Sequence, residues 1–145
     1  MSTKPVEIQG KTILEMNVGD LTSFRKTITE TDVHLFAGIT GDMNPLHIDQ
    51  SYAATTQFSK PLAHGVIGVG MLIGVMAREL PGGVLLGESV KFLQPVFIGD
   101  TITAFVKVID KNDDKDLITF KIWCENQSGV TVMEGEAQGL VKKRR

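Results

Sequence analysis

The chain has 145 residues, which is enough for one domain with a sizeable core and too few for two independent domains. Its formal net charge of -2 and its ordinary apolar and charged content exclude the electrostatic pattern of a nucleic-acid binder, so we expect no nucleic-acid partner. The single cysteine, Cys124, allows no intramolecular disulfide, and the N-terminal residues lack a signal-peptide pattern, which favours a cytoplasmic protein.

The first predicted elements are a strand and a helix. The strand lies near residues 23–29, and the helix begins near Thr29 or Thr31, where a Ser/Thr-type cap precedes a helical apolar pattern. Gly41 should end this helix. Because no internal repeat, linker or low-complexity tract is found, we predict one domain over residues 1–145, with 1–15 as an N-terminal extension and 142–145 as a solvated basic tail.

A carboxylate and an imidazole follow at the next turn. Asp42 and His47 are five residues apart, and between them Asn44 and Pro45 have the pattern of a helix cap and a first helical residue. This arrangement would place His47 in the first turn of a helix, close to Asp42. Such a pair can transfer protons. The alternative is that Asp42 and Asn44 are turn formers and that His47 is a partly buried surface histidine.

A second histidine precedes the longest apolar segment. His64 and Gly65 begin a helix over residues 65–77 that has no polar face, so we expect it to be surrounded on all sides. It is too short to span a bilayer, which needs about 20 apolar residues. The free backbone N–H groups at its start can hold a carbonyl oxygen that becomes negative during a reaction, with Gly65 as the natural donor. His64 could transfer a proton, or it could cap or brace the loop.

Alternation with period two replaces the helical pattern after this helix. Turn-rich segments separate the alternating runs, and we interpret the runs as an antiparallel meander in which Cys124 is a core residue. An apolar helix followed by a curved sheet that can wrap it predicts a layered α+β fold. The four strands of the meander are predicted near residues 85–97, 101–108, 118–124 and 130–141.

No metal or other cofactor is predicted. Asp49 and His34 could be combined with the residues above into a metal site. However, the sequence has no H-x-x-x-H or cysteine pattern that would support such a site.

Two blocks of the sequence resemble one protein family. The segment Phe36-Ala37-Gly38-Ile39-Thr40-Gly41-Asp42-x-Asn44-Pro45-x-His47 is similar to the hydratase motif of the MaoC-like (R)-specific enoyl-CoA hydratases. Ala63-His64-Gly65 resembles the opening of the central helix of this family, and residues 90–101 resemble the strand that follows. The likeness extends over about residues 16–141 and leaves residues 1–15 outside it.

The resemblance implies a hot-dog fold, in which a curved antiparallel sheet wraps a long central helix and residues 33–58 form a helical lid insert over the acyl site. It implies that Asp42 and His47 are the catalytic pair, that Asn44 assists in the same loop, and that the N–H of Gly65 is an oxyanion donor. The members that this chain resembles pair as homodimers.

Three further residues are candidates for substrate binding. His64 and Gly70 lie at the start and in the body of the central helix, where Gly70 could line an acyl tunnel. Lys60 stands in the approach to that helix, where many relatives carry glycine or arginine. This departure leaves open how the phosphates of CoA are held: Lys60 could contact them, or it could be a solvated lysine.

The implied activity is the reversible hydration of trans-2-enoyl-CoA to (R)-3-hydroxyacyl-CoA by a protein without a membrane partner. The alternatives are the same chemistry on acyl carrier protein as a dehydratase, thioester hydrolysis, and a non-catalytic acyl-CoA binding module. The presence of both Asp42 and His47 argues against the last alternative. Hydration requires a base for the attacking water, a donor for the thioester oxygen and a proton for the alpha carbon, which this set of groups could supply.

Overall fold

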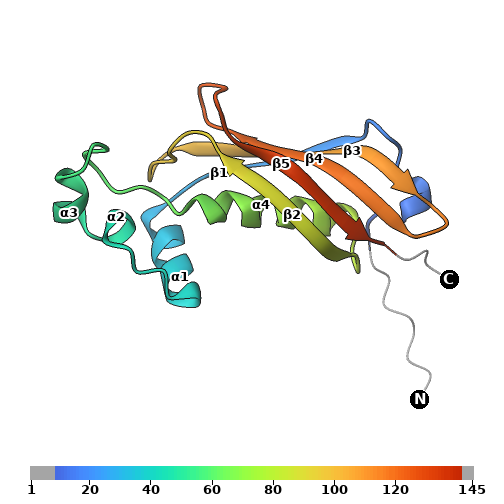
Figure 1. Ribbon diagram of the computed structural model, residues 1–145, viewed down its shortest axis with the longest axis horizontal. Helices are drawn as coiled ribbons and strands as arrows, with labels where there is room; N and C mark the ends of the chain where they lie inside the picture. Colours follow the sequence, from blue (N-terminus) through green and yellow to red (C-terminus); the bar gives the residue numbers. More distant parts are fainter. Residues whose placement is uncertain (1–8, 142–145) are drawn as a thin grey trace, which may run out of the picture.

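A five-stranded antiparallel sheet covers one face of a long helix, and three short helices cluster at the N-terminal end of that helix (Figure 1). The computed structural model describes residues 9–141. The strand order is β1-β3-β4-β5-β2, and the hot-dog fold expected from the sequence is confirmed. In chain order the elements are η1 Ile13–Glu15, β1 Leu21–Thr27, α1 Glu30–Thr40, α2 Pro45–Ile48, α3 Gln50–Ala54, α4 Gly65–Glu79, β2 Val84–Phe92, β3 Thr101–Asn112, β4 Leu117–Glu125 and β5 Thr131–Leu140.

The core lies between α4 and the sheet, and the period-two pattern of the strands specifies it. On β3 and β4, every second side chain is buried and faces α4. Cys124 on β4 is fully buried, as predicted, and its Sγ lies 3.9 Å from the Gly68 carbonyl oxygen of α4. The buried members of these two strands are Ile102, Ala104, Val106, Val108, Ile118, Phe120, Ile122 and Cys124.

Helix α4 is buried on one side only, so the prediction that it is surrounded on all sides is wrong for the single chain. Met71, Leu72 and Val75 pack on the sheet, whereas Val66 and Ile73 are 49% and 37% exposed. The reason is that the five strands of one chain cover one face of the helix. None of the helices in residues 9–141 is long and apolar enough to cross a membrane.

The predicted four-strand meander is also wrong in one respect. Strands β3, β4 and β5 are consecutive neighbours, but β2 pairs with β5 and β3 pairs with β1. Strand β2 ends at Phe92 rather than at Phe97. The Leu93 and Gln94 N–H groups both donate to the Val132 carbonyl, which breaks the regular ladder, and Pro95 then has no N–H with which to continue it. Beyond Pro95, the Val96 carbonyl accepts a hydrogen bond of 2.8 Å from the Ala63 N–H, in the approach to α4.

The caps predicted for the first two helices are confirmed. Thr29 caps α1 and forms a capping box with Asp32, and Gly41 ends the helix in the left-handed conformation at φ 76°. Asn44 caps α2 through a 3.0 Å bond from the Leu46 N–H to its Oδ1, with Pro45 as the first helical residue. These caps fix a tight connection in which Asp42 lies between two helices.

Candidate active site

Asp42 lies in the short connection between α1 and α2. Its backbone N–H donates to the Thr40 hydroxyl at 3.2 Å, and its Oδ1 accepts from the Asn44 N–H at 3.3 Å. The side chain of Asp42 is 46% exposed in the single chain. The local turn therefore holds the carboxylate through backbone groups and leaves it accessible from outside.

His47 projects from α2, three residues beyond the Asn44 cap. Its Nδ1 lies 2.8 Å from the Leu62 carbonyl oxygen. Because a carbonyl oxygen only accepts hydrogen bonds, Nδ1 carries the proton in the neutral ring, and Nε2 keeps a free lone pair. The backbone thus fixes both the orientation of this imidazole and the nitrogen that is available for chemistry.

His64 is the N-cap residue of α4 and the only polar residue among the buried ones of the described chain, at 2% exposure. Its Nε2 lies 3.0 Å from the Asp42 carbonyl oxygen and 3.9 Å from the Asp42 Oδ2. Its side chain makes no capping hydrogen bond to the helix. Of the two roles considered from the sequence, the structure favours bracing the Asp42 loop.

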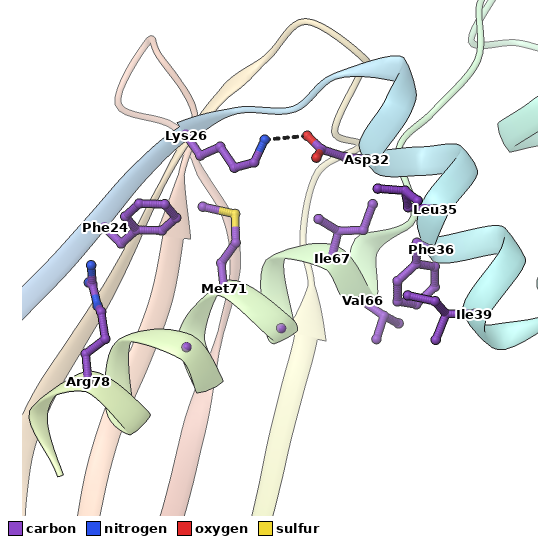
Figure 2. A pocket seen from close by; sticks show the side chains of 12 residues that line it. Phe24, Lys26, Asp32, Leu35, Phe36, Ile39, Val66, Ile67, Met71 and Arg78 are labelled. Atoms are coloured by element: carbon purple, nitrogen blue, oxygen red, sulfur yellow. Dashed lines mark hydrogen bonds and ion pairs between the residues drawn. The ribbon is translucent and has the colours of Figure 1, made fainter. Parts of the chain in front are cut away.

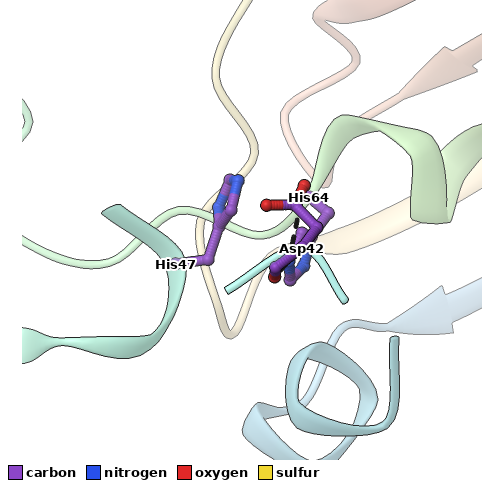
Figure 3. A group of neighbouring side chains, drawn as sticks. All are labelled: Asp42, His47 and His64. Carbon is purple, nitrogen blue, oxygen red and sulfur yellow. Dashed lines mark hydrogen bonds and ion pairs between the residues drawn. The ribbon is translucent and has the colours of Figure 1, made fainter. Parts of the chain in front are cut away.

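These three side chains form one compact cluster (Figure 3). One carboxylate oxygen of Asp42 and one ring nitrogen from each histidine lie within 4.8 Å of one another. The rings of His47 and His64 are in contact, with centroids 3.9 Å apart and an interplanar angle of 33°. The predicted proximity of Asp42 and His47 is therefore found, and His64 joins them.

Gly65 begins α4 directly beside this cluster. As the first residue of the helix, its N–H has no intrahelical acceptor, and it lies at the positive end of the helix dipole. A β-carbon at this position would lie 2.7 Å from the Phe92 ring, so only glycine fits without moving that ring. The position combines a free backbone donor with close packing against Phe92.

The cluster opens into a cleft of about 450 Å³. Polar groups of Asp42, His47 and Gln94 occur among walls that are otherwise largely apolar. Phe58 and Phe92 belong to these walls, and sequence reasoning missed both. A signal existed for Phe92 alone, since it immediately precedes the proline-containing segment that leaves the sheet.

Two of the other predicted residues lie outside this cleft. The side chain of Asn44 caps α2, so its contact with Asp42 is made by its backbone N–H. Lys60 is exposed, and its Nζ lies 4.4 Å from the centre of the Phe97 ring. Neither lines the cleft, although both lie in segments adjacent to it.

Gly70 lines a second hollow, an apolar groove of about 460 Å³ between α1, β1 and α4 (Figure 2). Val66 lines both the groove and the cleft beside the cluster, and Phe36 of the groove contacts the His64 ring at a centroid distance of 4.7 Å. A β-carbon at Gly70 or at Gly74 would meet no atom within 4 Å. The two glycines therefore widen the groove and do not serve close backbone packing.

One ion pair closes a rim of the groove. Lys26 Nζ lies 2.6 Å from Asp32 Oδ2. Burial favours a higher pKa for the Asp32 carboxyl, but hydrogen bonds from Lys26 and Thr29 outweigh burial and leave the pKa below its usual value. The exposed α1 side chains Leu35 and Ile39 also border the groove, on the segment that the resemblance predicts to be a lid.

The only group of candidate metal ligands in the described residues is Asp42, His47 and His64. The combination with Asp49 and His34 that the sequence suggested is not formed. Asp49 instead caps α3 by accepting from the Tyr52 N–H at 2.9 Å. Within the cluster, His64 Nε2 already donates to a backbone carbonyl, so this atom is not free to bind a metal.

Comparisons with known proteins place the chain in a family and give it relatives of similar fold. The family described as "MaoC like domain" matches residues 16–130. An (R)-specific enoyl-CoA hydratase from Rhodospirillum rubrum is 40% identical over 132 residues, which cover 90% of this chain and 91% of that protein. One from Aeromonas caviae is 36% identical over 84% of this chain and 92% of its own length. The solved structure of an unliganded R-hydratase from Pseudomonas aeruginosa superposes with a TM-score of 0.87 at 33% identity, and covers 92% of this chain and 86% of its own.

Proposed function

The chain belongs to the MaoC-like domain family, and we propose that it is an (R)-specific enoyl-CoA hydratase. The observation that carries this proposal is the cluster of Asp42 and His47 beside the free N–H of Gly65, at one end of an apolar cleft. The relatives named above have the same activity and match most of the chain. The reaction is the reversible addition of water to a trans-2-enoyl thioester.

Asp42 and His47 hold the attacking water in this mechanism. One carboxylate oxygen of Asp42 and one ring nitrogen of His47 lie within 4.8 Å of each other, and hydrogen bonds of about 2.8 Å allow one water to bridge groups at this separation. The Asp42 carboxylate and the Nε2 of His47 both accept hydrogen bonds, so the two hydrogens of the water are engaged and a lone pair remains for the beta carbon. The proton that the water loses passes to this pair and returns from it to the alpha carbon.

Gly65 acts on the other end of the conjugated system. When water attacks the beta carbon, negative charge develops on the thioester oxygen. The N–H of Gly65 and the positive end of α4 stabilise this charge without reorganisation, because the backbone is fixed before the reaction begins. Asn44 assists indirectly, since its backbone N–H donates to the Asp42 carboxylate.

The acyl chain of the substrate extends from the cleft into the apolar groove. Val66 lines both hollows, so a chain that passes this residue enters the space above Gly70 and Gly74. The groove is bordered mainly by apolar side chains of α1 and α4, which suit a hydrocarbon tail. The CoA portion lies on the open side of the cleft, and the segment that contains Lys60 lies nearby.

One assay separates this function from its alternatives. Purified protein is mixed with crotonyl-CoA, and the ultraviolet absorbance of the conjugated double bond is followed together with free thiol. We expect loss of absorbance without thiol release. Thiol release would identify a thioesterase, and unchanged signals with tight acyl-CoA binding would identify a binding module. A parallel assay with crotonyl-acyl carrier protein tests the dehydratase alternative, which predicts a clear preference for that carrier.

A homodimer is part of the proposal. Strand β2 is an edge strand, and Val84 and Leu86 on it are 58% and 54% exposed. An exposed apolar edge usually pairs or is covered. Pairing with a second copy would cover this edge and the neighbouring open side of the cleft. Sedimentation should give twice 15.8 kDa, whereas a concentration-independent monomer would contradict the proposal.

A cytoplasmic location completes the proposal. The only thiol of the chain, Cys124, is buried and unpaired, which is compatible with a reducing compartment. Cell fractionation of the native source tests this, and recovery with the membrane fraction would contradict it.

A further inference from the structure

The buried side chain of His64 joins three parts of the site that come from different segments of the chain. Its Nε2 donates to the Asp42 backbone, its ring contacts the His47 ring, and its own backbone begins the helix that presents Gly65. Phe36 contacts the ring at a centroid distance of 4.7 Å. Displacement of this one imidazole would therefore move both members of the catalytic pair.

The hydrogen bonds assign opposite tautomers to the two histidines. His64 has Nε2 at 3.0 Å from a carbonyl oxygen, so Nε2 carries the proton of the neutral ring. His47 has Nδ1 at 2.8 Å from a carbonyl oxygen, so its proton is on Nδ1. Only the second arrangement leaves an Nε2 lone pair for the attacking water. His64 directs its Nε2–H into the backbone and takes no part in proton transfer.

The other ring nitrogen of His64 indicates that this side chain does more than fill space in the core. Nδ1 is buried and has no hydrogen-bond partner among the described residues. A buried acceptor without a partner is unfavourable, and an apolar side chain in the same space would avoid this loss. The imidazole is thus better explained by what its Nε2–H and its ring do for Asp42 and His47.

We propose that His64 is a positioning residue. It holds the Asp42 loop through its Nε2–H and fixes the His47 ring by contact. It exists as the Nε2–H tautomer, whereas His47 exists as the Nδ1–H tautomer. This inference rests on the proposed hydratase function for its kinetic consequence. The tautomer assignment itself does not depend on any activity. The two can therefore fail separately.

The first experiment is long-range ¹H–¹⁵N correlation spectroscopy of the imidazole nitrogens in the unmodified protein. We expect the Nε2–H pattern for His64 and the Nδ1–H pattern for His47. His34 is the internal control, because it is exposed on α1 and should show the averaged pattern of a freely exchanging ring. A His34→Gln variant assigns that signal. An Nδ1–H or averaged pattern at His64 would overturn the proposal.

The second experiment compares His64→Gln with His64→Asn. The amide nitrogen of glutamine can take the place of Nε2 and donate to the Asp42 carbonyl, whereas that of asparagine corresponds to Nδ1 and cannot reach it. We expect His64→Asn to lower kcat about 100-fold with little change in KM, since loss of alignment affects the reaction more than binding. His64→Gln should recover a large part of this loss.

The melting temperatures and the tautomer measurement make the comparison of the two His64 variants interpretable. Melting temperatures of the two variants should be similar, because both amides are polar and close in size. Equal kcat for the two variants would overturn the role of the Nε2–H. If either variant fails to fold, the tautomer measurement on the unmodified protein still decides the proposal. Absence of hydration by the unmodified protein would instead refute the proposed function, and would leave the tautomer result intact.

Discussion

Helix α4 supports two regions of opposite character, its N-terminal end and its packed middle. At the N-terminal end, Asp42, His47 and His64 bring polar groups together around a free backbone N–H. In the middle, Leu72 and Val75 are fully buried against the sheet, and this packing begins one turn into the helix at Gly68, which lies against Met133 and Cys124 with no room for a side chain. The difference shows how one helix can hold a reactive site rigidly: the middle anchors it to the sheet, and the end is left for chemistry.

The two regions should therefore respond differently to substitution. Buried apolar contacts account for stability in the middle, whereas the polar end leaves Asp42 46% exposed and His64 Nδ1 without a partner. Changes at the end should alter turnover and leave melting almost unchanged. Changes in the middle should alter melting first.

The largest effect is expected for Asp42→Asn and His47→Gln. Each should lower kcat by about 10² to 10⁴-fold, because the amide keeps the shape but cannot accept the proton of the attacking water. The double variant should be little worse than either single one if the two residues hold one water as a unit. Crotonyl-CoA kinetics and thermal melting check this. An Asp42→Asn protein with normal melting and kcat within a few-fold of the unmodified protein would remove Asp42 from the mechanism.

Gly68→Leu should have the largest effect on stability. A β-carbon at Gly68 would lie 2.5 Å from the Met133 methyl carbon and 3.6 Å from the Cys124 sulfur. Overpacking of a filled core typically costs about 1 to 3 kcal/mol, so melting should fall clearly. Denaturant unfolding measures the loss. Unchanged stability would mean that the sheet-facing side of α4 is less closely packed than the structure indicates.

Gly70→Leu is the matched control on the open side of the same helix. No atom lies within 4 Å of a β-carbon at this position, and leucine has a higher helix propensity than glycine. Stability should be unchanged or slightly higher, while the groove becomes shorter. We expect activity on crotonyl-CoA to persist and activity on 2-octenoyl-CoA to fall. A uniform loss across both chain lengths would argue against an acyl chain in the groove.

The packed middle could be predicted from sequence more completely than the catalytic end. Alternation along β3 and β4 reports which side chains are buried, and the caps at Thr29 and Asn44 depend on neighbouring residues only. The proximity of Asp42 and His47 followed from the Asn44-Pro45 pattern for the same reason. These are local signals, and the structure confirms them.

Features that depend on distant pairing could not be predicted. The Asp42 carbonyl and His64 are 22 residues apart, and the His47 ring is held by a carbonyl 15 residues away. Strand β2 pairs with β5 rather than β3, because the segment after Phe92 leaves the sheet. Likewise, the open side of α4 reflects how much of a helix five strands can cover. The hydrophobic periodicity of a single segment carries no information about which distant segment it contacts.

The smallest effect concerns Glu88, on the edge strand β2. Burial raises the pKa of its carboxyl group, and one of its oxygens is buried without a hydrogen-bond partner among the described residues. A raised carboxyl pKa means that the charged form is disfavoured in the folded state. The charged carboxylate of Glu88 therefore destabilises the folded protein. This destabilisation is absent below the pKa of the unfolded state, grows as the pH rises, and is complete above the raised pKa of the folded state.

Glu88→Gln should accordingly raise the melting temperature at pH 8, and the gain should shrink toward pH 4. The same charge helps burial raise the pKa of the Cys124 thiol to about 12, so the variant should also lower that pKa slightly. Glu136→Gln on the adjacent strand β5 is the matched control, since the same change is made there at an exposed side chain. Paired melting curves at several pH values measure both. If the gain in melting temperature were equal at all pH values, the effect of Glu88 would come from packing and not from its charge. Glu88 would then resemble the packed side chains of α4 rather than the polar groups at its N-terminal end.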